Sequence, residues 1–127
     1  MHNLFRISLI TLASTVAMFS TSLAGEVDVV KVVAQQTSVQ NHRFDVTLRH
    51  ADEGWDHYAN KWDVVDPEGN VLGERILHHP HVNEQPFTHS LSGVMIPDDI
   101  EFVTIRGHDS LHLYGGVEYK VDLTTLR

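Results

Sequence analysis

The sequence predicts an all-β protein, an antiparallel immunoglobulin-like β-sandwich of about seven strands. Apolar and polar residues alternate with a period of two in one short segment after another, and residues typical of turns separate these segments. No segment beyond residue 24 shows the 3.6-residue apolar periodicity of an amphipathic helix. Several short strands with turns between them in roughly 100 residues are typical of this fold class.

Each expected strand is recognised by its own alternation. The clearest is NHRFDVTLRH, in which Phe44, Val46 and Leu48 point to one face and polar residues to the other. VEYKVDL alternates in the same way near the end of the chain. In chain order, the expected strands are residues 26–34, 41–50, 58–65, 71–77, 86–94, 99–107 and 117–123.

Turn residues occupy the gaps between these strands. The segment 66–70, DPEGN, combines a proline, which fixes one backbone torsion, with a glycine, which accepts a positive φ. Segments 96–99 and 113–116 are interpreted as turns for similar reasons. Because the sequence contains no repeat or linker, we expect one β-sandwich domain over residues 25–127.

Residues 1–24 have the features of a signal peptide that is cleaved. Arg6 provides a positive charge, an apolar run extends over 7–19, and Ser22-Leu23-Ala24 gives a small-x-small cleavage pattern. An uncleaved membrane anchor is the alternative, but the apolar run is shorter than the roughly 20 residues that cross a bilayer. We therefore expect a periplasmic or secreted protein that is not held in the membrane after the signal is removed.

Composition excludes several classes of function. The formal net charge is −8, and all 17 acidic residues lie beyond residue 24, so no basic face is available for nucleic acid or anionic lipid. The chain has no cysteine, which excludes disulfides, thiolate redox chemistry and a cysteine nucleophile. An acidic protein of this kind is compatible with cation binding.

The histidines are expected to gather at one end of the sandwich. Consecutive antiparallel strands run in opposite directions, so the connections between them alternate between the two ends. Of the histidines beyond residue 24, only His42 falls at the opposite end. The histidines expected at the common end are His50, His57, His78, His79, His81, His89, His108 and His112.

A metal site at this end is the interpretation that we favour. Imidazole is the commonest metal ligand, and HPH and HDSLH can each supply two ligands from one loop. Nitrogen and carboxylate donors suit Zn(II), Cu(II), Ni(II) or Fe(II), and carboxylates of Asp56, Glu84 or Asp109 could orient the ligating rings. The candidate ligands are His79, His81, His108 and His112, with His57 and His78 in reserve.

Some histidines have a simpler explanation. His50 continues the apolar face of Phe44, Val46 and Leu48, and His89 shares the face of Phe87. We interpret these two as hydrogen-bonded histidines at the rim of the core. The sequence His108-Asp109-Ser110 contains the residue types of a hydrolase triad, but neighbours on one strand cannot adopt that geometry.

Two longer segments resemble known proteins. GWDHYANKWDVVDPEGNVLGERILHHPHVNEQPFTHSL and TIRGHDSLHLYGGVEYKVDL are similar to a group of uncharacterised small exported bacterial β-sandwich proteins, a resemblance that implies no particular activity. Asp56-His57-Tyr58 and the segment 108–112 also resemble ligand-bearing segments of the superoxide reductases, whose iron lies on an immunoglobulin-like sandwich. The cysteine that ligates iron in that family is missing here.

Three functions remain open from the sequence. The first is a periplasmic metal-binding protein, a carrier, buffer or sensor for a divalent transition metal. The second is a metal-dependent redox enzyme that acts on superoxide or peroxide. The third is a non-catalytic module that contacts another envelope protein. The sequence identifies no catalytic residue, and it favours a role without turnover.

Overall fold

A computed structural model describes residues 25–127 of the chain, so the expected signal peptide, residues 1–24, lies outside the described residues. This part of the chain consists of seven strands and one short 3-10 helix, η1. The strands are β1 (Asp28–Ser38), β2 (Asn41–Arg49), β3 (Ala59–Val65), β4 (Val71–Ile76), β5 (Phe87–Met95), β6 (Phe102–Asp109) and β7 (Tyr119–Asp122), and η1 is Thr124–Leu126.

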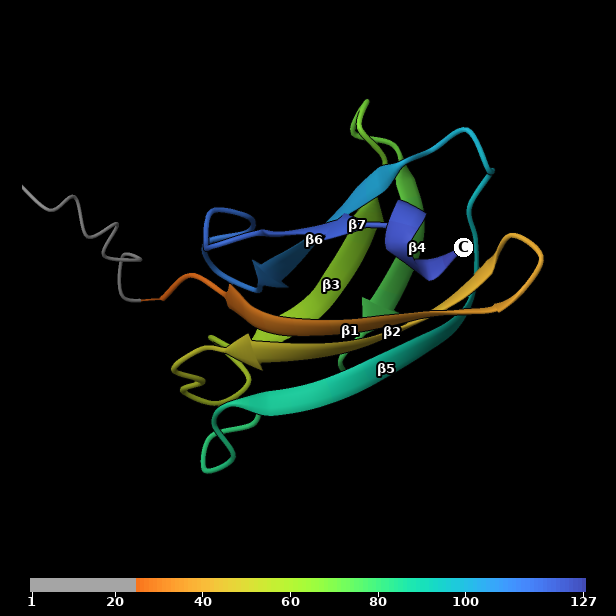
Figure 1. Cartoon of the computed structure of the whole chain (residues 1–127). Helices are drawn as coiled ribbons and strands as arrows, with labels where there is room; N and C mark the ends of the chain where they lie inside the picture. The colour runs from red at the N-terminus through yellow and green to blue at the C-terminus, as the bar shows by residue number, and fades with distance from the viewer. Residues whose placement is uncertain (1–24) are drawn as a thin grey trace, which may run out of the picture.

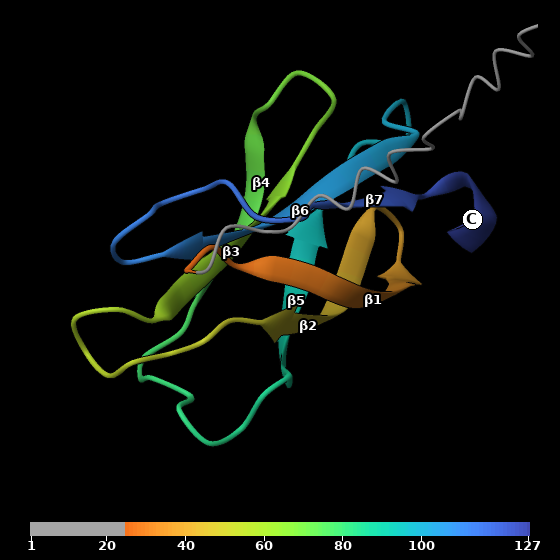
Figure 2. The same cartoon turned by 90° about the vertical axis from the view of Figure 1, so that its left-hand side faces the viewer.

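The strands form two antiparallel sheets, which confirms the predicted β-sandwich (Figure 1). One sheet has the order β1-β2-β5 and the other has the order β4-β3-β6-β7. The loops that follow β2, β4 and β6 lie together at the left-hand end of Figure 1, and Figure 2 looks onto that end. The structure thus brings the histidine-bearing loops to one end, as strand direction predicts.

Two strands differ from the expected ones by three or more residues at one end. β1 continues to Ser38 instead of ending at residue 34, because it forms a hairpin with β2 in which Ser38 pairs with Asn41. β6 begins at Phe102 and reaches Asp109, because its ladder with β3 extends until Asp109 pairs with Ala59. The second difference matters for function, since it makes Asp109 part of a strand and fixes the direction of its side chain.

The inner faces of β2 and β6 lead from the core to the histidine-rich end. Alternate residues of each strand are buried, as the period-two pattern requires. The inward positions of β2, including the residue that follows it, are His42, Phe44, Val46, Leu48 and His50. The inward positions of β6 are Val103, Ile105, Gly107 and Asp109. Both inner faces therefore end in a buried polar residue at the same end of the sandwich.

Val27 and the first residues of β1 close the edge between the sheets at this end. Val27 is 1% exposed, and it lies so close to β6 that a Cβ on Gly107 would meet its Cγ1 at 2.3 Å. The Val29 amide donates a hydrogen bond to the Val117 carbonyl, 2.8 Å away, which ties β1 to the segment before β7. Among residues 25–127, no helix has the length and apolarity needed to cross a membrane.

The contact at Gly107 gives a test of this packing. We expect Gly107→Ala to lower the free energy of unfolding by roughly 1–3 kcal/mol, because the added methyl group must displace Val27. Urea denaturation of the metal-free protein measures the change. Thr104→Ala, at an outward position of the same strand, is the matched control and should cost less. Equal stabilities of G107A and wild type would show that the start of β1 is not packed on β6.

Candidate metal centre

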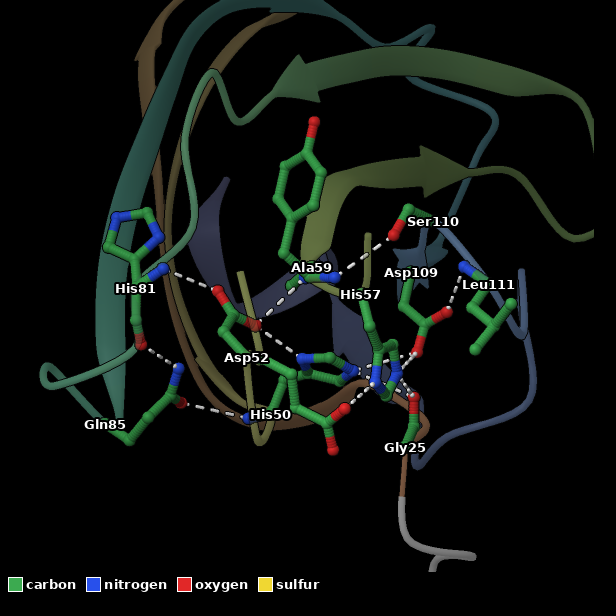
Figure 3. A network of polar contacts seen from close by, with 12 residues as sticks. Gly25, His50, Asp52, His57, Ala59, His81, Gln85, Asp109, Ser110 and Leu111 are labelled. Atoms are coloured by element: carbon green, nitrogen blue, oxygen red, sulfur yellow. Dashed lines mark hydrogen bonds and ion pairs between the residues drawn. The ribbon is translucent and has the colours of Figure 1, made fainter. Parts of the chain in front are cut away.

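The polar ends of the two inner faces meet at one cluster, which we call the Asp109 centre and define as Gly25, His50, His57, Asp109 and His112 (Figure 3). His50 follows β2 and Asp109 ends β6. His57 lies in the loop before β3, His112 lies in the loop after β6, and Gly25 precedes β1. Three regions that are distant in sequence, namely residues 25, 50–57 and 109–112, thus meet at the centre.

Three imidazole nitrogens face the same two oxygen atoms. His50 Nε2, His57 Nε2 and His112 Nδ1 lie 2.8, 3.0 and 3.1 Å from Oδ2 of Asp109. The same three nitrogens lie 2.8, 3.1 and 3.0 Å from the carbonyl oxygen of Gly25. The centre therefore combines three nitrogen donors, one carboxylate oxygen and one backbone oxygen around a single point.

The second carboxylate oxygen of Asp109, Oδ1, stabilises the loop after β6. Oδ1 accepts hydrogen bonds from the backbone amides of Leu111, at 2.8 Å, and of His112. Backbone hydrogen bonds in both directions between Asp109 and Leu113 close the same loop. This loop geometry turns the ring of His112 back toward Oδ2, so Asp109 positions the third imidazole as well as contacting it.

Two further carboxylates hold the outer nitrogens of the rings. Nδ1 of His50 contacts Oδ1 of Asp52, and Nδ1 of His57 lies 3.5 Å from Oε2 of Glu53. A carboxylate on one ring nitrogen leaves the other nitrogen free to ligate and fixes the direction of the ring, an arrangement typical of metal-bound histidines. Asp52 and Glu53 thus occupy the supporting position for which the sequence suggested Asp56, Glu84 or Asp109.

Asp52 is itself held by three hydrogen-bond donors. Besides the contact with His50, its carboxylate accepts the backbone amides of Ala59, at 3.0 Å, and of His81, at 2.6 Å. Burial opposes the charged form of Asp52, but its hydrogen bonds to His50 and to these amides outweigh that effect and lower its pKa. Asp52 is therefore a permanent anion behind His50.

Opposite charges face each other at the centre when no metal is bound. Burial opposes the charged form of His50, but hydrogen bonds to Asp52, Gly25 and Asp109 outweigh it and raise its pKa to about 9. The same competition raises the pKa of His57 and lowers that of Asp109. At neutral pH the metal-free centre thus holds a buried imidazolium between two carboxylates, and a metal ion would replace its proton.

The donor set fits a metal ion. The ligand atoms of His50, His57 and Asp109 all lie within 4.8 Å of one another, and these three residues are buried. Two ligand atoms at about 2.0 to 2.1 Å from one ion would lie about 2.8 to 3.4 Å apart for bond angles between roughly 90° and 110°, and the nitrogen–oxygen contacts to Asp109 fall within this range. The side chain of His112 is 39% exposed, so one side of the centre faces solvent.

Gly25 is required for the close approach of the chain to the centre. Its φ is +115°, and a Cβ at this position would meet Cε1 of His112 at 2.5 Å and Cε1 of His57 at 3.2 Å. A side chain here would both strain the backbone and displace two imidazoles. Glycine is thus the residue that lets a backbone carbonyl reach the ring nitrogens.

The candidate ligands from the sequence fall into different places. His57 and His112 belong to the Asp109 centre. His79 and His81 lie side by side with a ring-centroid distance of 4.5 Å, in a second cluster. His108 turns instead to the side chain of Asn60, with Nδ1 2.6 Å from Oδ1, and its ring lies against Tyr114. His78 is exposed, and none of the contacts described above involves it.

Sequence reasoning did not select His50, Asp109 or Gly25 as candidate donors. His50 is a buried, hydrogen-bonded histidine as expected, yet its Nε2 also faces the centre. The period-two alternation could have identified His50 and Asp109, because both occupy inward positions at the ends of β2 and β6. A polar residue of this kind at the inward position of a strand end needs a partner. No sequence pattern marks the Gly25 carbonyl.

The protonation of His50 gives a prediction for the metal-free protein. A group whose pKa is raised on folding, here from 6.5 to about 9, stabilises fully below pH 6.5 and loses this effect as the pH rises through 9. We expect the free energy of unfolding to fall by on the order of 3 kcal/mol over this window, with His57 acting in the same direction. Chemical denaturation with a chelator present measures it.

The matched variant is Asp52→Asn, which keeps the shape of the side chain but removes the anion on Nδ1 of His50. Its unfolding free energy should fall less between pH 7 and pH 9, because the pKa of His50 is then closer to its ordinary value. A wild-type stability that stays constant over this range would contradict the buried imidazolium.

Comparison with known proteins finds a relative of this chain. A protein of Halomicrobium mukohataei named "Putative lipoprotein" is 41% identical over 97 residues, which are 76% of this chain and 47% of that protein. The chain thus spans about half the length of the relative that it matches. No family model and no solved structure matches the chain. The relative supports the resemblance to proteins without a named activity, but its source is an archaeon, and neither a bacterial origin nor the likeness to superoxide reductases receives support.

Proposed function

We propose that this protein is an exported metal-binding protein that holds a divalent transition metal in the Asp109 centre, as a carrier, buffer or sensor. One observation carries the proposal: three imidazole nitrogens face the same carboxylate oxygen and the same backbone oxygen at distances between 2.8 and 3.1 Å. The convergence of three rings on one point is the arrangement that a shared cation requires.

The donor types restrict the metal. The centre offers imidazole nitrogen and oxygen only, and the chain has no thiolate. Such donors suit Zn(II), Cu(II), Ni(II) and Fe(II). Two histidines and one carboxylate with open positions are typical of non-haem Fe(II) sites, and His50, His57 and Asp109 supply this set. The third imidazole, His112, would complete a set that is also suited to Zn(II).

Two observations support an exported location in the cell envelope or outside it. Residues 1–24 have the sequence features of a signal peptide. The relative from Halomicrobium is named as a lipoprotein, which is a class of exported protein. A metal carrier, buffer or sensor in this location would exchange its ion through the exposed side of the centre, next to His112.

Elemental analysis and metal titration test the proposal. We expect protein purified without a histidine tag to contain about one transition-metal ion in the Asp109 centre. Asp109→Asn should lower its affinity by at least about 100-fold, because it removes the negative charge that faces all three rings. If D109N does not fold, His57→Gln replaces it, since His57 lies nearer the surface and contributes one nitrogen only.

The matched control is His108→Gln, whose ring contacts Asn60 and Tyr114 rather than the centre and which should keep full metal content. Loss of the ion in H108Q but not in D109N would exclude the Asp109 centre as the site. A well-folded wild type that binds no metal at all would remove the proposal and favour a module that contacts another envelope protein.

A redox enzyme acting on superoxide or peroxide is the second candidate. The observation in its favour is that His50, His57 and Asp109 form the set of two histidines and one carboxylate that is typical of non-haem Fe(II) sites reacting with oxygen species. In place of the missing thiolate, the Asp109 carboxylate provides the anionic donor. The exposed side next to His112 leaves room for a small oxidant.

Stopped-flow kinetics separates the two functions. If the protein is such an enzyme, Fe(II)-loaded protein should reduce one superoxide per iron oxidised, with uptake of two protons to form hydrogen peroxide. D109N loaded at saturating iron should react at least about 10-fold more slowly, because the metal loses its anionic donor. A rate equal to that of free Fe(II) would leave metal binding as the function.

A further inference from the structure

A second group of histidines lies beside the Asp109 centre, and we call it the His81–His89 pair. Nε2 of His81 and Nε2 of His89 are 3.0 Å apart. The ring of His81 stacks on Phe87, with a centroid distance of 4.0 Å and an interplanar angle of 1°. This stacking and the 5% exposure of His81 fix one of the two nitrogens in place.

The contact between two imidazole nitrogens has two explanations. One is a hydrogen bond from one ring to the other, and the second is a metal ion that both rings share, since ligand nitrogens on one ion lie about 2.9 to 3.4 Å apart. Among the described residues, His89 is the sole hydrogen-bond partner of the His81 ring, because Nδ1 of His81 is buried and has no partner.

Further donors lie at the open side of the pair. The ring of His79 is 4.5 Å from that of His81. His79, His81 and Glu84 line a pocket of about 360 Å³, which is open to solvent. Burial, aided by the neighbouring histidines, lowers the pKa of both His81 and His89, and the charge of Glu84 opposes this only in part. Both rings are therefore neutral at pH 7, which is the form that binds metals.

We propose that His81 and His89 form a second metal site, distinct from the Asp109 centre, in which the two facing Nε2 atoms ligate a divalent transition ion such as Zn(II) or Cu(II) and water fills the other positions. Neutral imidazoles are donors that suit these ions. His81 also lines the open pocket, which gives an ion a route to this site.

The two sites do not share a ligand. Figure 3 shows that the backbone of His81 faces Asp52, whereas its ring is turned away from His50. The side chain of Gln85 makes a second connection, because its amide group donates to the His81 carbonyl at 2.9 Å and its oxygen accepts the His50 amide at 3.0 Å. The sites are thus neighbours that can be altered separately.

Titration of the metal-free protein with Zn(II), followed by calorimetry against a competing chelator, tests this inference. We expect two ions per chain in the wild type and one in His89→Gln, which removes one of the two facing nitrogens. His78→Gln, an exposed histidine of the same segment, is the matched control and should bind two ions. Asp109→Asn should bind one, so the two sites are counted independently.

Each outcome decides between the sites. One ion in the wild type that is lost in D109N but kept in H89Q would overturn the second site and leave the proposed function intact. One ion that is lost in H89Q but kept in D109N would support the second site and overturn the proposed function. Two ions in H89Q would show that the pair is only a hydrogen bond.

If H89Q does not fold, proton NMR of the wild type gives the same answer. The imidazole C–H signals of His81 and His89 should shift or broaden together on addition of the second equivalent of Zn(II). The site would be contradicted if these signals did not change up to a two-fold molar excess of Zn(II).

Discussion

The histidine-rich end of this protein depends on the burial of one carboxylate. The side chain of Asp109 is fully buried, and a buried anion is costly unless charges and hydrogen bonds compensate it. Its two oxygens accept two backbone amides and face three imidazole nitrogens, so the compensation comes from a loop and from three segments of the chain. The positions of His50, His57 and His112 follow from this need. The polar centre therefore continues the buried inner faces of β2 and β6.

Much of the fold, but less of the site, could be predicted from the sequence. Period-two alternation placed Phe44, Val46 and Leu48 on the inner face, and strand direction brought the histidines to one end, because both depend only on local geometry. Which histidines face one another depends instead on loop conformations and on how far a strand extends. Asp109 was expected just beyond its strand, although the ladder with β3 includes it. The contribution of Gly25 is a backbone oxygen, which no residue pattern reveals.

The two histidine clusters differ in the direction in which the pKa of their imidazoles is shifted. In the Asp109 centre, carboxylates surround the rings and raise the pKa of His50 and His57, so protons compete with a metal there. In the His81–His89 pair, burial and neighbouring imidazoles lower the pKa, and no proton has to leave at neutral pH. One scaffold thus offers a site that is surrounded by carboxylates, the Asp109 centre, and a site of neutral imidazoles, the His81–His89 pair. Selectivity between metals of different charge density would follow from this contrast.

The bridge through Asp52 and Gln85 has a thermodynamic consequence. Asp52 contacts the His50 ring and the His81 backbone at once, and Gln85 joins the same two residues by a second route. An ion that changes the geometry of one metal site through this bridge alters the free energy of ion binding at the other site. Linkage requires the effect to be reciprocal, so each ion would multiply the dissociation constant of its neighbour by one common factor.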